Sequence, residues 1–342
     1  MERRIDLRSD TVTLPPPGML DVLRDAELGD DYYHDDPTVK RLEQKAAEML
    51  GKQAALLVLS GTMGNLASVM AQASPGTEVI VEQDAHTFHS EAGGMARFVG
   101  AMPKRIPGVL GVLDPDTVER QISTKDVLNG GTSLICVEDT HNAAGGTVQP
   151  LENLEALRRV ADRHGVKIHM DGARLFNAAV AQGIPASEIV RCVDSVTFCL
   201  SKGLACPLGA VICGSREFIE TARCCRQAVG GGMRQAGIIA APGIWALDNM
   251  IERLADDHRN ARRLAELVTE AGFGVDLRTV QTNMLKVETS PYTAEEFKAA
   301  LNAQGIDLNI VVPGVVRLVT HWQITPEHVE EVGRAVRSLR RQ

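Results

Sequence analysis

The stretch Val193–Gly203 reads VDSVTFCLSKG, an apolar run of strand length that ends in Ser201 and Lys202. Earlier in the chain, Val166–Arg174 reads VKIHMDGAR, so a second short apolar run ends in Asp171. Short apolar runs followed by polar residues and glycine are typical of buried strands that lead into loops. The two stretches therefore predict two strands with a lysine and an aspartate at their ends.

A lysine and an aspartate at two strand ends are the groups that pyridoxal phosphate enzymes require. The lysine holds the cofactor aldehyde as a Schiff base. The carboxylate keeps the pyridine nitrogen protonated, which makes the ring an electron sink. By itself the pair is a weak signal, because polar residues follow the strands of any α/β protein. Asp171 is also consistent with a helix cap, and Lys202 with a solvated surface lysine.

Apolar runs of strand length alternate with helix-period segments through most of the chain. This pattern predicts an α/β fold, with a mostly parallel sheet flanked by helices. Asp36–Gly51 carries the clearest helix signals, because a capping aspartate precedes Pro37 and the segment closes with glycine. Leu151–His164, closed by Gly165, is a second predicted helix. The predicted strands are Ala54–Leu59, Glu78–Glu82, Ser133–Glu138, Lys167–Met170, Ser195–Leu200 and Ala210–Gly214.

The C-terminal part of the chain predicts a second, smaller domain. A long helical stretch runs from about Ala236 to Ala271, and Pro242 is expected to kink or interrupt it. We expect a large domain over residues 1–245 and a compact α+β domain over residues 246–342. The elements predicted for the small domain are strands at Asn283–Glu288 and Val315–Thr320 and helices at Ala294–Gln304 and Pro326–Arg340.

Composition excludes several classes of function. The formal net charge of −8 argues against a nucleic-acid or anionic-membrane partner, since both require a basic surface. No apolar run approaches the roughly 18 residues of a membrane span, and the N-terminus has no apolar signal core. The 7 cysteines show no zinc-type spacing, so we expect free thiols in the cytoplasm, no disulfide framework and no metal.

Further polar residues also follow predicted strands, at the carboxyl edge where open α/β sheets bind ligands. Ser60, Gly61 and Thr62 precede a helix and are suited to cradle a phosphate, although such a turn is common without a ligand. His86 is placed to lie against a planar ring, and it is equally consistent with an ordinary hydrogen-bonding histidine.

Three arginines are candidates for binding anions. Arg174 and Arg317, which opens a predicted strand, each suit a carboxylate or a surface ion pair. Arg234 lies in the glycine-rich segment Gly230–Gln235 and suits a phosphate, unless that segment is a hinge. A carboxylate, a lysine, a phosphate loop and several arginines at one sheet edge together favour the functional interpretation.

These residues lie in motifs that resemble the L-threonine aldolases, a family of fold-type I pyridoxal phosphate enzymes with an aspartate aminotransferase-like architecture. The resemblance covers nearly the full length, and aminotransferases share the aspartate and the lysine but not the whole set. The motifs are Leu7–Thr13 (LRSDTVT), Gly29–Pro37 (GDDYYHDDP), Ser60–Asn65 (SGTMGN), Glu138–Asn142 (EDTHN), Asp171–Arg174 (DGAR), Ser201–Gly203 (SKG), Gly230–Gln235 (GGGMRQ) and Arg317–His321 (RLVTH).

The resemblance implies a role for each residue that would bind the cofactor. Lys202 would hold pyridoxal phosphate as a Schiff base, and Asp171 would pair with the ring nitrogen. His86 would stack on the pyridine ring, while Gly61 and Thr62 would bind the phosphate.

The resemblance also implies a site shared between subunits of a homo-oligomer. Arg234 would reach the phosphate from the neighbouring subunit, and Tyr33 would close the site from the same partner. Ser9, Arg174 and Arg317 would bind the substrate carboxylate and the region of the ring oxygen. Family members are usually tetramers built as pairs of dimers, so a homotetramer is expected.

The implied reaction is the retro-aldol cleavage of L-threonine or L-allo-threonine to glycine and acetaldehyde, with the preference between the two left open. Some relatives place a histidine before the EDTH strand to act on the β-hydroxyl, but Thr124–Gly131 (TKDVLNGG) contains none. His86 and His89 are therefore the candidate bases, acting directly or through a water. Two rival interpretations are another fold-type I aminotransferase or β-eliminating lyase, and a cofactor-binding regulator without turnover.

Overall fold

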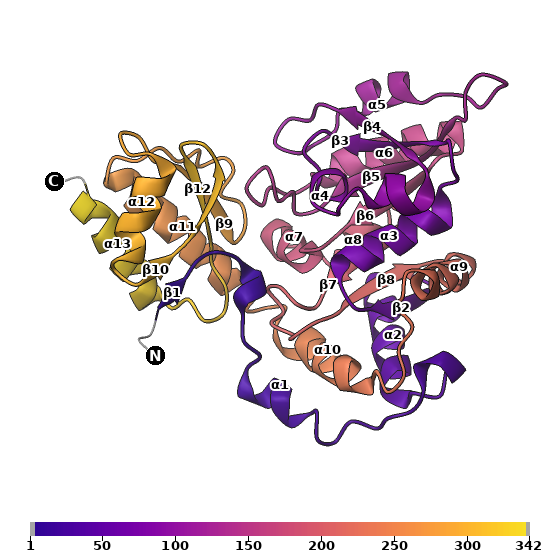
Figure 1. Ribbon diagram of the computed structural model, residues 1–342, viewed down its shortest axis with the longest axis horizontal. Coiled ribbons are helices and arrows are strands. Elements are labelled where there is room, and N and C mark those ends of the chain that lie inside the picture. Colours follow the sequence, from indigo (N-terminus) through magenta and orange to yellow (C-terminus); the bar gives the residue numbers. More distant parts are fainter. Residues whose placement is uncertain (1–3, 340–342) are drawn as a thin grey trace.

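The computed structural model describes residues 4–339, which are built around a seven-stranded sheet with helices on both faces (Figure 1). The strand order is β2-β8-β7-β6-β5-β3-β4. In that order the strands are β2 (Ala54–Val58), β8 (Ala210–Gly214), β7 (Ser195–Cys199), β6 (Lys167–Asp171), β5 (Thr132–Glu138), β3 (Glu78–Glu82) and β4 (Met102–Ile106).

All strands of this sheet except β8 run in the same direction. β8 pairs antiparallel with both β2 and β7, whereas the strands from β7 to β4 pair in parallel. Because two reversals restore the direction, β2 runs the same way as β7. The carboxyl ends of all these strands except β8 therefore meet at one edge of the described sheet, and the predicted α/β class is confirmed.

The helices form two layers because alternate strand residues face opposite sides of the sheet. Leu57 and Ile80 join the core beneath α2 and α6, whereas Leu56 and Val79 join the clusters on the α3 side. α3 (Gly61–Gln72) and α9 (Arg216–Ala228) form one layer. The other contains α2 (Pro37–Leu50), α5 (Pro115–Gln121), α6 (Leu151–His164), α7 (Leu175–Gln182), α8 (Ala186–Val190) and α10 (Gly237–Asn249), and the short α1 (Pro17–Asp21) and α4 (His86–His89) lie in loops.

A smaller unit with its own apolar core follows the large sheet. Its antiparallel sheet has the order β11-β12-β9, and the N-terminal β1 (Ile5–Asp6) pairs in parallel with β10 (Ile306–Asp307). The predicted domain boundary between residues 245 and 246 stays a prediction. Ile5 of β1, although far from the small unit in sequence, packs in the apolar core of that unit. The remaining elements are β11 (Asn309–Val312), β12 (Val315–Val319), β9 (Met284–Glu288), α11 (Leu254–Glu270), α12 (Ala294–Asn302) and α13 (Pro326–Leu339).

The long predicted helix is interrupted, but not at its proline. Pro242 lies inside α10, and the break comes after Asn249, before α11 begins at Leu254. A proline inside a helix removes one intrahelical hydrogen bond and crowds the preceding turn, yet α10 continues past Pro242, which is buried where the helix packs on α2. The sequence also gave no signal for β4, an edge strand with mostly polar or exposed positions. None of the helices in residues 4–339 is long and apolar enough to cross a membrane.

A buried ion pair ties the N-terminal segment to the large sheet. Nε and Nη2 of Arg174 each donate to a different oxygen of Asp10 at 2.7 Å, and both side chains are almost fully buried. Asn283, just before β9 of the small unit, also donates to Asp10 at 3.2 Å. Burial raises the pKa of Asp10, but Arg174 outweighs burial and holds that pKa below its ordinary value. Asp10 is therefore a carboxylate that connects three parts of the chain.

Replacing Asp10 with asparagine should destabilise the fold strongly at neutral pH. The Asp10 pKa is lowered in the folded chain, so the carboxylate contributes stability above its ordinary pKa and loses it only in strongly acid solution. Asp10→Asn leaves a buried guanidinium without its anion, which typically costs about 3–5 kcal/mol. Denaturant unfolding at fixed protein concentration measures the difference.

The matched control is Asp276→Asn, which removes an exposed carboxylate that also pairs with an arginine at 2.7 Å. Solvent screens that pair, so its loss should change the unfolding midpoint little. Equal unfolding midpoints for Asp10→Asn and Asp276→Asn would contradict the assigned role of Asp10.

Candidate active site

The carboxyl edge of the sheet brings five of the predicted site residues to one cavity of about 200 Å³: Lys202, Asp171, Gly61, Thr62 and His86. Lys202 follows β7, Asp171 ends β6, and Gly61 and Thr62 begin α3 directly after β2. Because these strands share a direction, residues far apart in the sequence meet here. The other residues that line the cavity are Ser60, Asn65, His86, Glu91, Ala173, Cys199 and Ser201.

Asp171 is a buried carboxylate on the wall of this cavity. Only 1% of the residue is exposed, and one carboxylate oxygen accepts a hydrogen bond from the backbone N–H of Ala173 at 3.1 Å. Polar atoms of Asp171, His86 and Glu91 lie within 4.8 Å of one another. A buried anion in a site that also contains Lys202 is suited to pair with a cationic ring nitrogen.

The N-terminus of α3 forms a second wall. Ser60 caps the helix by accepting a hydrogen bond from the N–H of Met63 at 3.2 Å. A Cβ atom on Gly61 would lie 2.7 Å from Sγ of Cys199, so only glycine lets the helix start this close to β7. Free backbone N–H groups and the helix dipole make such a terminus a favourable place for a phosphate.

These features together fit pyridoxal phosphate. The aldehyde requires an amine, the ring nitrogen an anion and the phosphate a helix N-terminus, and Lys202, Asp171 and the start of α3 supply them within one cavity. His86, on the same cavity, adds a planar ring.

The structure separates the two candidate histidines. His86 lines the cavity, with Nδ1 3.1 Å from Oε1 of Glu91 and its backbone N–H donated to Glu138 at 2.7 Å. The hydrogen bond to Glu91 outweighs burial and raises the pKa of His86. His89 is not brought to this cavity. Its Nε2 lies 3.0 Å from the backbone carbonyl of Gln83, and about half of its side chain is exposed.

Of the arginines predicted to bind a carboxylate, Arg174 is buried and Arg317 is half-buried, and both lie near the junction of the two units. Arg174 is already paired with Asp10. Nη1 of Arg317 donates to Asn142 at 2.8 Å and Nη2 to the carbonyl of Arg8 at 3.3 Å. The buried Nε of Arg317 has no partner among the described residues. Burial first, and then the charge of Arg174, lowers the pKa of Arg317. An unpaired donor beside a second cation favours binding of an anion.

Ser9 follows Arg8, whose carbonyl accepts a hydrogen bond from Arg317. The Ser9 hydroxyl accepts a hydrogen bond from the N–H of Thr11 at 3.2 Å. Arg234 and Tyr33 do not line the cavity of their own chain. The Arg234 guanidinium lies 5.0 Å from the centroid of the Tyr32 ring, and Tyr33 is 67% exposed. The N–H of Asp31 donates to the Arg234 carbonyl at 2.9 Å, so the segments that carry Arg234 and Tyr33 are neighbours at the surface.

Sequence reasoning missed two side chains of this site, Asn65 and Glu91. Asn65 ends the Ser60–Asn65 motif, and nothing in that motif indicates a role for its amide. Glu91 follows His86 in a segment without helical or strand periodicity. Their burial and the hydrogen bond of 2.8 Å between them depend on the packing of α3 against the loop after α4. Charged residues in a short loop are usually solvated, so no local signal marked Glu91.

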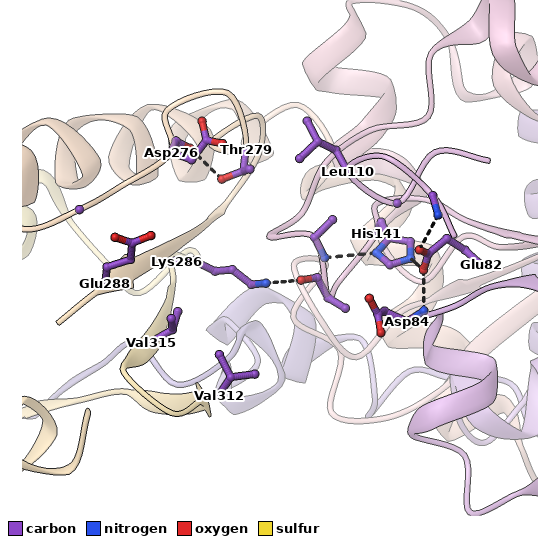
Figure 2. Close-up of a pocket in the computed structure, with 15 residues that line it drawn as sticks. Glu82, Asp84, Leu110, His141, Asp276, Thr279, Lys286, Glu288, Val312 and Val315 are labelled. Carbon is purple, nitrogen blue, oxygen red and sulfur yellow. Dashed lines mark hydrogen bonds and ion pairs between the residues drawn. The ribbon is translucent and has the colours of Figure 1, made fainter. Parts of the chain in front are cut away.

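A second cavity of about 340 Å³ lies between the large sheet and the small unit (Figure 2). It shares no lining residue with the Lys202 cavity. Lys286 of β9 donates to the carbonyl of Ala143, and Nε2 of His141 lies 3.0 Å from Glu82. These contacts hold the loop after β5 between the two units. Although this cavity is larger, it has no lysine–aspartate pair at strand ends, and we assign the chemistry to the Lys202 cavity.

Three comparisons place the chain among known proteins. Residues 6–290 match the family model described as beta-eliminating lyase. The chain is 42% identical to low-specificity L-threonine aldolase 1 of Arabidopsis thaliana, over 96% of this chain and 94% of that protein. It is also 42% identical to the low specificity L-threonine aldolase of Escherichia coli K12, over 96% and 97% of the two chains.

Solved structures share the fold. A threonine aldolase of Leishmania major has a TM-score of 0.84 at 20% identity, covering 98% of this chain and 99% of that one. Serine palmitoyltransferase of Sphingomonas wittichii has a TM-score of 0.80 at 20% identity, covering 99% and 87%. At this level of identity the structures establish the fold, while the closer sequences establish the family. The chain therefore belongs to the beta-eliminating lyase family, with the low-specificity L-threonine aldolases as its near relatives.

Proposed function

We propose that the protein is a pyridoxal phosphate-dependent aldehyde-lyase. It cleaves L-threonine, L-allo-threonine and related β-hydroxy-α-amino acids to glycine and an aldehyde such as acetaldehyde. The observation that carries the proposal is one cavity that combines Lys202, Asp171 and the N-terminus of α3. The names of the 42% identical relatives supply the substrate class.

Each wall of the cavity has a distinct task. Lys202 would form the covalent link to the cofactor aldehyde, and Asp171 would hold the proton on the ring nitrogen. Gly61 and Thr62 bind the phosphate at the start of α3. When bound, the cofactor supplies an electron sink for the bond that breaks at the substrate Cα.

The substrate carboxylate binds to Arg317, with Ser9 and Arg174 beside it. The buried Nε of Arg317 donates to no group within residues 4–339, which supports this assignment. Fixing the carboxylate fixes the rotation about the bond from Cα to the amino nitrogen. A fixed rotation would select which bond at Cα is broken when the cofactor supplies its electron sink.

His86 is the stronger candidate for the base that removes the β-hydroxyl proton. It lines the cavity, and Glu91 supports its imidazole. The hydroxyl proton moves to Nε2 of His86 as the Cα–Cβ bond breaks and the aldehyde leaves.

We further propose a homotetramer built from dimers that share two sites. Arg234 and Tyr33 are neighbours on an exposed surface and do not line their own chain's cavity, as residues that complete a partner's site would be. We also propose that the enzyme works in the cytoplasm. All seven cysteines lie within residues 4–339 and are free thiols, which suits a reducing compartment.

The purified enzyme should release acetaldehyde and glycine from L-threonine without forming a keto acid. Acetaldehyde is measured with alcohol dehydrogenase and NADH, and L-allo-threonine is assayed separately. Lys202→Ala should lose the visible absorbance of the bound cofactor and nearly all turnover, because no other lysine lines the cavity. Keto acid as the main product would favour an aminotransferase or an eliminating lyase, and a fully active Lys202→Ala variant would refute the assignment of the lysine.

The two histidine variants should behave differently. His86→Asn should lower kcat for cleavage by about 10²–10⁴-fold, the usual contribution of a general base. His89→Asn should stay close to wild type, because His89 is half-exposed and bonded to a backbone carbonyl. Steady-state kinetics from pH 6 to pH 9 compare them. A larger loss in His89→Asn than in His86→Asn would reverse the assignment.

Two inactive variants should complement each other if the site is shared. In a hybrid of Arg234→Ala and Lys202→Ala chains, one site receives Lys202 from one subunit and Arg234 from the other, so part of the activity should return after mixing and reassembly. The matched control replaces the Lys202→Ala chain with the double variant Lys202→Ala/Arg234→Ala, which cannot form an intact shared site. No recovery, once native mass measurement has confirmed hybrids, would mean that each site is built from one chain.

A further inference from the structure

A chain of buried hydrogen bonds runs beneath the cofactor cavity, and its direction is fixed at one end. Nε2 of Gln72, at the end of α3, donates to the backbone carbonyl of Ser68 at 3.0 Å and to the hydroxyl of Ser195 at 2.8 Å. A carbonyl can only accept, so the Gln72 amide nitrogen must be the donor in both contacts.

The donor-to-acceptor direction of these hydrogen bonds continues through the buried His169. The Ser195 oxygen accepts from Gln72 and keeps its own proton, which we assign to Nδ1 of His169, 2.9 Å away. Burial lowers the pKa of His169 to about 4, so the imidazole is neutral at physiological pH. Its single proton then lies on Nε2, which is 3.2 Å from Oδ1 of Asn65.

The chain ends at Glu91. With Oδ1 of Asn65 accepting from His169, the amide nitrogen of Asn65 faces Oε1 of Glu91 and donates to it at 2.8 Å. Burial, together with the charge of Asp171, raises the pKa of Glu91 overall, and its hydrogen bonds to His86 and Asn65 limit that rise. Two N–H donors on one buried carboxylate favour its ionised form.

We propose that this one-directional chain of hydrogen bonds sets the tautomer of His86. Nδ1 of His86 lies 3.1 Å from the same Glu91 oxygen. Since that oxygen is an acceptor, Nδ1 carries the proton and donates it, and Nε2 is the only acceptor on the ring. Asn65, His169 and Ser195 are positioning residues: they act through Glu91 on an imidazole in the site. The use of Nε2 as a base rests on the proposed function, but the tautomer does not.

The charged groups around His86 come from several elements. Glu91 is its direct partner, while Asp171 of β6 and Glu138 of β5 also raise the pKa of the imidazole. Lys202 lines the same cavity. As the pH falls through the raised pKa of His86, Nε2 becomes protonated. Nε2 can then no longer accept a proton. Removing the negative charge of Glu91 should therefore shift this transition to lower pH.

The test uses the full-length chain freed of cofactor, so that His86 is probed without turnover. Diethyl pyrocarbonate modifies only the unprotonated imidazole, and fragment masses report the fraction modified at His86 separately from His89. Glu91→Gln keeps the shape but removes the charge. Asn65→Leu removes the donor that keeps Glu91 ionised. Both should move the midpoint of His86 modification to lower pH.

Two variants control for a merely structural effect. His169→Gln retains an amide donor that can replace Nε2 toward Asn65, so its midpoint should match wild type. Ser68→Ala removes a buried hydroxyl from α3 that has no partner within the described residues, and it leaves the backbone carbonyl in place. An equal shift in Ser68→Ala would show general loosening and overturn the proposal. Unchanged midpoints in both Glu91→Gln and Asn65→Leu would also overturn it.

Kinetics of the cofactor-loaded enzyme separate this proposal from the proposed function. Glu91→Gln should lower kcat by about 10–100-fold, by analogy with partners that orient functional histidines at metal sites, and should move the acid limb of the pH profile in the same direction as the modification midpoint. If the wild-type enzyme releases no aldehyde but the midpoints shift as expected, the proposed function fails and the coupling of His86 to Glu91 and Asn65 stands.

Discussion

The common direction of the strands from β7 to β4, together with β2, is the constraint on which the site depends. Each parallel strand delivers the residues after its carboxyl end to the same edge. Lys202, Asp171 and the start of α3 come from three such strands and meet there without any local sequence contact. β8 runs antiparallel to both of its neighbours, β2 and β7. β2 therefore has the same direction as β7, and the carboxyl end of β2 lies at the shared edge. Reversing β2 would carry the turn that begins α3 to the opposite edge of the sheet.

Buried charges then attach the rest of the molecule to this edge. The pair between Asp10 and Arg174 holds the N-terminal segment against the loop after β6, and Asn283 connects the small unit to the same carboxylate. Lys286 and Arg317, both on the small unit, reach the loop after β5. The substrate carboxylate is thus expected where the small unit meets the large sheet, so the relative placement of the two units sets the geometry of binding.

The sequence predicted the strand ends well and the side-chain networks poorly, for a physical reason. Asp171 and Lys202 end apolar runs, and such runs are local signals of buried strands. The links from His169 to Asn65 and on to Glu91 join residues from three separate elements, so they appear only after folding. Arg174 was predicted next to the site, but its partner Asp10 lies far away in the sequence. The strand β4 was missed because an exposed edge strand has no apolar run.

The pairing of β1 with β10 has a consequence for the order in which the chain folds (Figure 1). Ile5 lies beside Ile306, so Ile5 leaves the ribosome about 300 residues before its partner. The apolar core of the small unit includes Ile5 and Leu7 and is incomplete without them. Contacts between residues so distant in sequence form slowly, because a long loop must close first. The small unit therefore reaches its final form only after β10 has been synthesised, and β1 has no strand partner until then.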